Sequence, residues 1–347
     1  MPAAAAARAA GAAAAASAAA PARVPLQPHA VPDDSVARNL GQGGRSVNDL
    51  HRLLVKRLCS AASEAWDKHV GKRGPVRSIP MKQTILMTVR ILTTGMQWYQ
   101  LESTIGSWQL HYSRFRKLSL MGVFENDFQT AGREYVTLKG SLARLLIDAT
   151  HIKARKGGPC VGPSPVDRGK NGSKLTVLAD EESVPLCAIF SAGNVSDTIQ
   201  LPTILETARK QYGNLSQFRE LLADKGYDSA ANRAACRRHG LLPRILKRRP
   251  RRNLPVAAPG PGVAGAPRRR NPRRGRRGMA APRSPPPAEN QGINACRWAV
   301  ERVFAWQDNY RRVIMREERN QATFKAMQFL SLSAIIYKKL EAAGITE

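Results

Sequence analysis

The chain has 347 residues, of which 43% are hydrophobic, enough for one large domain or two ordinary ones with a sizeable core. It carries 55 Lys and Arg against 26 Asp and Glu, a formal net charge of +29. No long apolar run, no GxxxxGK[ST] and no CxxC pair among the five cysteines occurs, which disfavours a membrane-spanning protein, a P-loop ATPase and a disulfide or zinc framework.

The positive charge indicates a polyanionic partner. A compact body with this charge repels itself unless a polyanion neutralises it, and nucleic acid is the usual one. The alternative is a basic disordered tail on a neutral domain. The scattered cysteines indicate reduced thiols, so we expect a cytoplasmic protein associated with the nucleoid.

Residues 1–45 are rich in Ala and Pro and poor in large apolar side chains, which predicts a disordered leader. A targeting segment is the alternative. Residues 46–138 are predicted to be helical, with one helix at Met81–Thr94 stopped by Gly95 and another from Trp108 to about Ser119 capped by Ser107. A short helix is expected at about 101–105. This outline resembles a helix-turn-helix, in which the second helix would enter the major groove, but an ordinary helical bundle is equally consistent with it.

An α/β pattern begins near residue 139. Apolar runs predict a strand at Leu142–Lys153, a hairpin of Lys174–Ala179 and Val184–Phe190, and later strands at 221–223 and 241–246, with helices at about 199–212 and 229–239. Three meandering strands followed by alternating helices and strands describe an α/β domain with a mixed sheet.

The segment 247–289 interrupts this pattern. From Lys247 to Ala288 it holds 13 Lys and Arg and no Asp or Glu, together with many Pro, Gly and Ala. This composition predicts a disordered basic insert, which is either a solvated linker or a nonspecific phosphate binder. A helical pattern resumes at about 290 and continues, with one break, to about 342, completing the domain that begins at 139.

Three acids stand where a fold can bring them together. Asp148 and Asp224 each end an apolar strand, and Glu301 lies in a helix four residues after Arg297. Acids at the ends of buried strands are costly to desolvate unless they are paired or bind metal. Each also has a simpler reading: Asp224 can begin a turn, and Glu301 can form a helical ion pair with Arg297.

The wording of these segments resembles bacterial insertion-sequence transposases of the DDE type, in the groups called IS four and IS five. The similar segments are Asp148–Ala154 with Gly162–Lys174 in the first catalytic region, Leu222–Asp228 in the second, and Arg297–Arg302 with Phe304–Trp306 in the third. The stretch from about Arg90 to Phe128 is similar to their N-terminal DNA-binding region. The resemblance covers roughly residues 80–340, apart from the basic insert.

The resemblance implies a ribonuclease H-like mixed sheet flanked by helices, with an N-terminal helical DNA-binding region. Asp148, Asp224 and Glu301 would be the catalytic residues and would hold two Mg²⁺ or Mn²⁺ ions for strand cleavage at the element ends and strand transfer into target DNA. The partners would be double-stranded DNA, comprising the terminal inverted repeats and the target, and a second copy of the chain on that DNA. The expected DNA contacts are Lys170, Lys174, Arg297, Arg114 and Lys117.

Asp197 and His151 are given structural interpretations beside the catalytic ones. Asp197 is expected to cap the following helix, and His151 is either a substrate contact or a packed or solvated histidine. The basic insert is longer than the segment that the family has at this point. One alternative is a catalytically inactive or domesticated transposase that only binds DNA, and another is a ribonuclease H-like nuclease that cuts without joining.

Overall fold

The computed structural model describes residues 51–70, 79–101, 106–247 and 293–345, with side chains from 297 onwards in the last range. The predicted leader, the short helix after Leu101 and nearly all of the basic insert lie outside these residues. Within the described residues, no helix is both long enough and apolar enough to cross a membrane.

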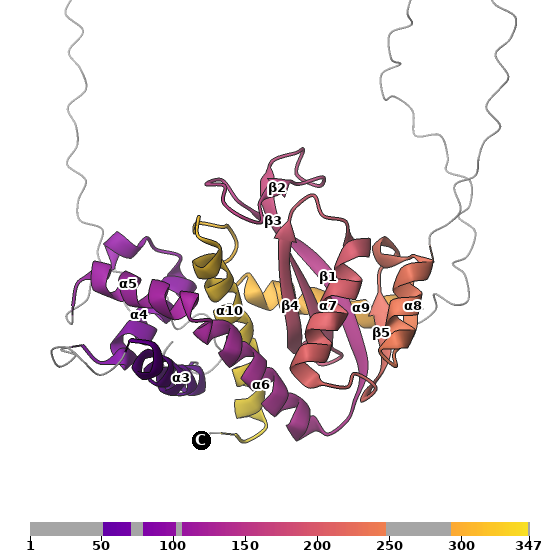
Figure 1. Cartoon of the computed structure of the whole chain (residues 1–347), viewed down its shortest axis with the longest axis horizontal. Helices are drawn as coiled ribbons and strands as arrows, with labels where there is room; N and C mark the ends of the chain where they lie inside the picture. The colour runs from indigo at the N-terminus through magenta and orange to yellow at the C-terminus, as the bar shows by residue number, and fades with distance from the viewer. Residues whose placement is uncertain (1–50, 71–78, 102–105, 248–292, 346–347) are drawn as a thin grey trace, which may run out of the picture. The chain divides into compact units, whose positions relative to one another are not determined.

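A mixed sheet forms the centre of the α/β part (Figure 1). The long strand β1 (Leu142–Lys153) pairs antiparallel with β3 (Asn171–Asp180), which pairs antiparallel with β4 (Pro185–Ala192). On its other side β1 pairs parallel with β5 (Phe218–Ala223), which pairs parallel with β6 (Leu242–Ile245). The two-residue strand β2 (Gly162–Pro163) pairs antiparallel with the first two residues of β3. The order β4-β3-β1-β5-β6 is that of a ribonuclease H-like sheet, so the predicted fold class is confirmed.

Helices cover both faces of this sheet (Figure 1). Helix α7 (Asp197–Tyr212) packs on β3 and β4, and α8 (Ala230–Arg238) packs on β6 and α7. Helix α9 (Ile293–Gln307) crosses β1, β3 and β5. Because the sheet is covered on both faces, nearly every side chain of β3 is buried, in agreement with the apolar runs of the sequence.

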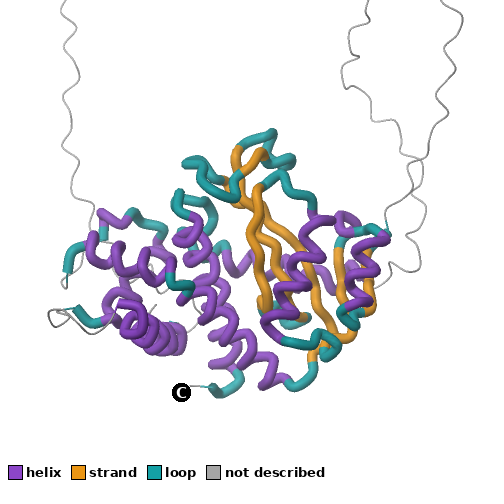
Figure 2. Tube along the Cα trace, in the orientation of Figure 1, coloured by secondary structure: helices purple, strands orange, loops and turns teal. Residues whose placement is uncertain are grey.

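The described residues of the N-terminal part form helices joined by loops and include no strand (Figure 2). It comprises α3 (Arg52–Val70), α4 (Met81–Thr94), the 3-10 turn η1 (Trp98–Gln100), α5 (Trp108–Leu120) and α6 (Val123–Lys139). A second 3-10 turn, η2 (Lys225–Tyr227), follows β5 in the sheet region. The predicted ends of α4 and α5 are confirmed: Gly95 closes α4 with a φ of 71°, and the Ser107 hydroxyl accepts a hydrogen bond from the backbone N–H of Leu110.

Helix α6 lies in the region predicted to be helical, but its limits were not predicted. Its apolar face is regular, with Phe124, Phe128, Ala131 and Tyr135 buried. Asp127 is buried on the same side of the helix, where Tyr337 of the C-terminal helix donates a hydrogen bond to it. That tertiary contact offsets part of the cost of burying the carboxylate.

The C-terminal helix α10 (Gln321–Ala342) joins the two parts. It packs against α3, α5 and α6 as well as against α9 and β4 (Figure 1). All described residues fall in one compact unit, Asn48–Glu347. The division into a helical region at 46–138 and a catalytic domain at 139–246 and 290–342 stays a prediction.

Candidate active site

Asp148 and Asp224 stand side by side on neighbouring parallel strands. Strand β1 pairs Ile147 with Ala223 of β5, so the next residue of each strand is the acid. The backbone carbonyl of Asp224 accepts the N–H of Tyr227 in the following turn, but its carboxylate makes no capping hydrogen bond there. The carboxylate of Asp224 is therefore available for other partners.

Glu301 reaches the same place from helix α9. The apolar face of this helix, including Val300 and Val303, is fully buried against the sheet. Glu301 lies at the border of that face, with its side chain 57% exposed. The acid of the third segment is thus held over the strand ends by the packing of its own helix.

The guanidinium of Arg297 contacts the carboxylates of all three acids. Its Nη2 atom lies 3.8 Å from Asp148 Oδ2 and 3.4 Å from Glu301 Oε1, and its Nη1 atom lies 3.6 Å from Asp224 Oδ1. The expected ion pair within the helix is present, but it is one of three. One guanidinium in contact with all three carboxylates shows that the residues singled out in the sequence converge at a single site.

The carboxylate of Asp148 is affected by its neighbours. Burial raises its pKa, and the charges of Asp224 and Glu301 raise it further, while Arg297 and the backbone N–H of Ala149 act in the opposite direction. Like charges disfavour one another's ionised form, and a nearby cation relieves that cost. The ionised form of the Asp148 carboxylate is therefore stabilised by the positive charge of Arg297 beside it.

Tyr227 adds a hydroxyl near the acids, which the sequence reading passed over. The residue is 1% exposed, and among the described residues its hydroxyl has no hydrogen-bond partner. Burial, followed by the charges of Asp197 and Asp148, raises the pKa of the Tyr227 phenol well above its usual value. The hydroxyl is therefore a neutral donor at the edge of the site.

Asp197 is not the cap of helix α7, contrary to the prediction. The cap is Ser196, whose hydroxyl accepts from the backbone N–H of Thr198 at 3.3 Å. Asp197 instead accepts a hydrogen bond of 2.6 Å from Lys174, which also donates to the carbonyl of Val195. The short side chain of Ser196 reaches the first turn, which leaves the carboxylate of Asp197 for the buried lysine.

The remaining predicted DNA contacts differ in position. Lys170 and Lys117 are exposed, as a phosphate contact requires. Lys174 is only 4% exposed and Arg114 is 8% exposed, and Arg114 donates 2.8 Å to the carbonyl of Ile79. Their charges are already used inside the protein, so the structure gives these two residues a packing role and does not present them to DNA.

His151 is half-buried beside the site. Its Nδ1 atom lies 3.3 Å from the hydroxyl of Ser164. Burial lowers the pKa of His151, and the nearby charge of Lys174 lowers it further. This environment favours the packed, neutral histidine that was one of the two readings of the sequence.

The acids fit a divalent metal by the chemistry of their donors. Within the described residues, no three His, Cys, Asp or Glu side chains are close enough together to enclose an ion as they stand. The triad nevertheless presents carboxylate oxygens around one positive group, and carboxylates are the ligands that Mg²⁺ and Mn²⁺ prefer.

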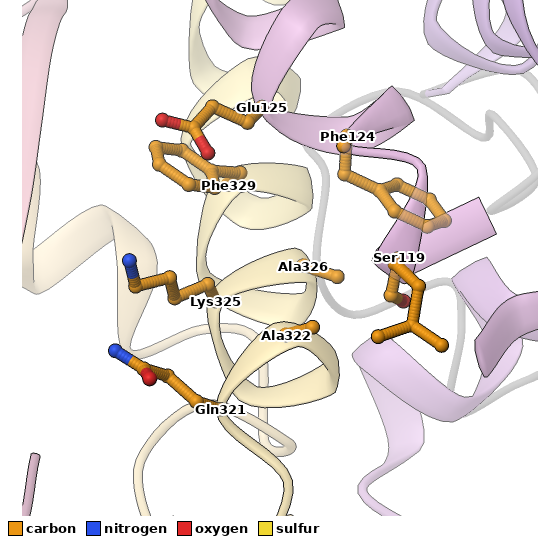
Figure 3. A pocket seen from close by; sticks show the side chains of 10 residues that line it. Ser119, Phe124, Glu125, Gln321, Ala322, Lys325, Ala326 and Phe329 are labelled. Carbon is orange, nitrogen blue, oxygen red and sulfur yellow. The ribbon is translucent and has the colours of Figure 1, made fainter. Parts of the chain in front are cut away.

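Two cavities lie away from the triad. One, of about 260 Å³, opens where α10 meets the corner between α5 and α6, with Glu125 and Lys325 at its edge (Figure 3). The other, of about 440 Å³, lies between α5 and the loop that precedes α10. None of the triad residues lines either cavity, so neither is part of the candidate active site.

The sheet is ribonuclease H-like. It carries one acid on the central strand β1, one directly after the adjacent parallel strand β5 and one on helix α9. This arrangement places the chain among the ribonuclease H-like proteins with an acidic site beside the sheet. Residues 140–336 match the family described as the Transposase DDE domain. The chain belongs to this family. The resemblance to bacterial insertion-sequence transposases of the DDE type is thereby confirmed.

A curated relative agrees with this family. A candidate transposase for insertion sequence element IS402 of Burkholderia cepacia is 30% identical over 207 residues, which are 58% of this chain and 79% of the relative. Among solved structures, the piggyBac transposase synaptic complex with hairpin DNA has 12% identity and a TM-score of 0.42 over 90% of this chain and 72% of that one. The Mos1 transposase paired-end complex with the left transposon end has 12% identity and a TM-score of 0.21 over 60% and 70%. Both TM-scores are below 0.5, so the assignment to the family rests on the sequence match.

Proposed function

We propose that this transposase cleaves DNA strands at the ends of an insertion sequence and joins the freed ends to target DNA, with Asp148, Asp224 and Glu301 holding two Mg²⁺ or Mn²⁺ ions. The observation that supports this function best is the contact of all three carboxylates with the guanidinium of Arg297. Side chains from two strands and a distant helix meet only because the fold brings them there.

Bound divalent ions would supply the activation of the attacking oxygen and the stabilisation of the leaving oxygen in such a reaction. The chain's own residues prepare the site. Paired strands hold Asp148 and Asp224 at a fixed separation, and Glu301 approaches from the helix above them. Arg297, freed from the acids, would turn its guanidinium to a phosphate of the DNA, which it can bind through two parallel hydrogen bonds.

The proposed partner is double-stranded DNA, in the form of the terminal repeats and the target. The net charge of +29 supports this partner, and exposed Lys170 and Lys117 are proposed contacts. Two ends must be cut in concert, so we propose that two copies of the chain act together on DNA. A cytoplasmic location near the nucleoid follows from this partner.

The test is cleavage and joining of labelled DNA that carries the element's own ends, with Mg²⁺ or Mn²⁺. The wild-type chain is compared with Asp224→Asn, which keeps the shape of the side chain and removes its charge. Asp308→Asn, a change at an exposed acid outside the triad, is the matched control. We expect metal-dependent cleavage and joining from the wild type and the control, and background levels from Asp224→Asn.

Two other outcomes would reject this function. DNA that is bound but never cut with either metal would make the chain a DNA-binding protein, the alternative of an inactive or domesticated transposase. DNA that is cut but never joined, even when a free 3′-hydroxyl end is supplied, would make it a nuclease.

A further inference from the structure

The larger cavity has an aromatic wall built by one face of helix α5. Trp108, Tyr112 and Arg116 line it, and their spacing of four residues places them on the same side of the helix. Trp108 and Tyr112 are half-buried, so part of each ring faces the cavity. Behind them, buried Trp98 holds the wall in place: its ring centroid lies 5.3 Å from that of Tyr112 and 5.2 Å from that of Phe115.

The opposite wall is the segment between α9 and α10, with Lys156 from the loop after β1. Buried Arg312 and Glu318 form an ion pair of 2.7 Å, and Lys156 lies 2.7 Å from Glu317. The two carboxylates of the wall are therefore already paired.

Two cations of the cavity have no such partner. Arg116 and Arg319 are both exposed, and no carboxylate of the described residues lies within ion-pair distance of either. The cavity thus combines exposed ring faces with uncompensated guanidinium groups. An anion that also carries a flat ring matches both features.

The wall of the cavity is connected to the triad. The backbone N–H of Arg316 donates 2.8 Å to the carbonyl of Lys153 at the end of β1, the strand that carries Asp148. The five residue steps of strand from Asp148 to Lys153 span about 17 Å. That is the length of about five nucleotides of a DNA strand. A strand that leaves the triad along β1 would therefore reach the cavity within a few nucleotides.

We infer that this cavity binds an unpaired nucleotide of the DNA strand, with its base against Trp108 and Tyr112 and its phosphate against Arg116 and Arg319. The inference rests on the proposed function for its source of DNA. The volume of about 440 Å³ lies in the range of sites that enclose a small ligand. A paired base is stacked within its duplex and cannot present its face to these rings, which restricts the ligand to an unpaired one.

The test is the binding of a labelled oligothymidylate, of a duplex of the same length, and of free thymidine monophosphate as a competitor, without metal. Raised salt suppresses the sequence-independent binding that the net charge produces. Trp108→Ala and Tyr112→Ala are compared with Tyr99→Ala, which removes an exposed ring outside the cavity. Arg116→Gln is compared with Arg133→Gln, which removes an exposed charge from α6.

We expect each cavity variant to weaken oligothymidylate binding about tenfold while duplex binding changes little, and the two controls to match the wild type. Circular dichroism of each variant verifies folding, and Arg116→Gln, at an exposed position, tests the cavity even if Trp108→Ala does not fold. Unchanged oligothymidylate binding, or an equal loss on the duplex, would overturn the inference. Displacement of the oligonucleotide by equimolar thymidine monophosphate would also overturn it, because the ligand would then be a free nucleotide.

Failure here is separable from failure of the proposed function. The binding test uses no metal and measures no cleavage, so its result does not depend on catalysis. A chain that cuts DNA normally but shows no cavity effect would refute only the nucleotide site. A chain that never cuts but shows the cavity effect would refute only the catalytic proposal.

Discussion

Nη1 of Arg297 lies 3.6 Å from Oδ1 of Asp224, which joins the helix of the third segment to the strand end of the second. The basic segment 247–289 separates the two in the sequence, so no local rule places them together. The same guanidinium also contacts Asp148 and Glu301. This contact explains how three acids can lie at one site of a folded chain.

Replacing Arg297 by Gln is expected to destabilise the protein in the presence of a chelator, because three carboxylates lose their shared cation. The groups are partly exposed, so the free energy of unfolding should fall by only about 1–2 kcal/mol. Urea denaturation measures this change. Arg297→Lys, which keeps the charge, should recover part of the loss, and equal stability of Arg297→Gln and the wild type would contradict the role given to this contact.

The pair of Lys174 and Asp197 predicts unequal effects of its two partners. Asp197→Ala leaves an ammonium group that is 4% exposed with only the carbonyl of Val195, and should cost about 2–3 kcal/mol. Lys174→Met removes the charge and keeps the apolar stem, so its cost should be smaller. Unfolding of both single variants and the double variant gives the coupling energy, and additive effects would show that the pair does not stabilise the native state.

Asp127 predicts a pH dependence of stability. Burial raises its pKa to about 6, from 3.8. The folded state therefore holds a proton that the unfolded state releases, so this residue lowers the free energy of unfolding as the pH rises from about 4 to about 6 and has no further effect above that. Asp127→Asn should thus gain stability relative to the wild type over this range, by up to about 3 kcal/mol. Parallel stability curves for the two proteins would refute the assignment.

Substitutions at Gly95 and Gly122 compare the cost of backbone strain alone with the cost of strain plus a steric clash. Both adopt a positive φ, 71° and 73°, but a Cβ atom added at Gly95 would lie 2.9 Å from Cβ of Arg311, whereas at Gly122 it would meet nothing within 4 Å. Replacement by Ala should cost about 1 kcal/mol at Gly122 and clearly more at Gly95. Thermal unfolding of the two variants measures the difference. Equal costs would contradict this prediction, because the segment around Arg311 would then move away from the added Cβ atom without a loss of stability.

Much of the fold could be predicted because its signals are local. The limits of α4 and the caps at Gly95 and Ser107 follow from side chains within one helical turn. The strands of the sheet follow from apolar runs, since a sheet covered on both faces buries nearly all of β3 and the Leu145–Ile147 run of β1. The hydrogen bond between Tyr337 and Asp127 of α6 could not be predicted, because it joins residues that are distant in the sequence.

The sequence was sufficient to select the acids of the candidate site, but not to place the residues around them. Both Asp148 and Asp224 follow an apolar run, which is visible in the sequence, although Asp148 lies within β1 and does not end it, whereas Asp224 follows β5. Asp197 and Tyr227 owe their positions to contacts with distant groups, so the sequence reading assigned the first to a cap and passed over the second.

By itself the sequence determined the order of helices and strands, the basic character of the chain and the acids that could meet at the strand ends, because these depend on residue type and local spacing. Only the tertiary structure decided which charges are used inside the protein. Arg114 and Lys174 are buried and paired, while Arg116 and Arg319 face a cavity. Burial and ion pairing depend on partners that are distant along the chain, and a one-dimensional pattern does not contain those distances.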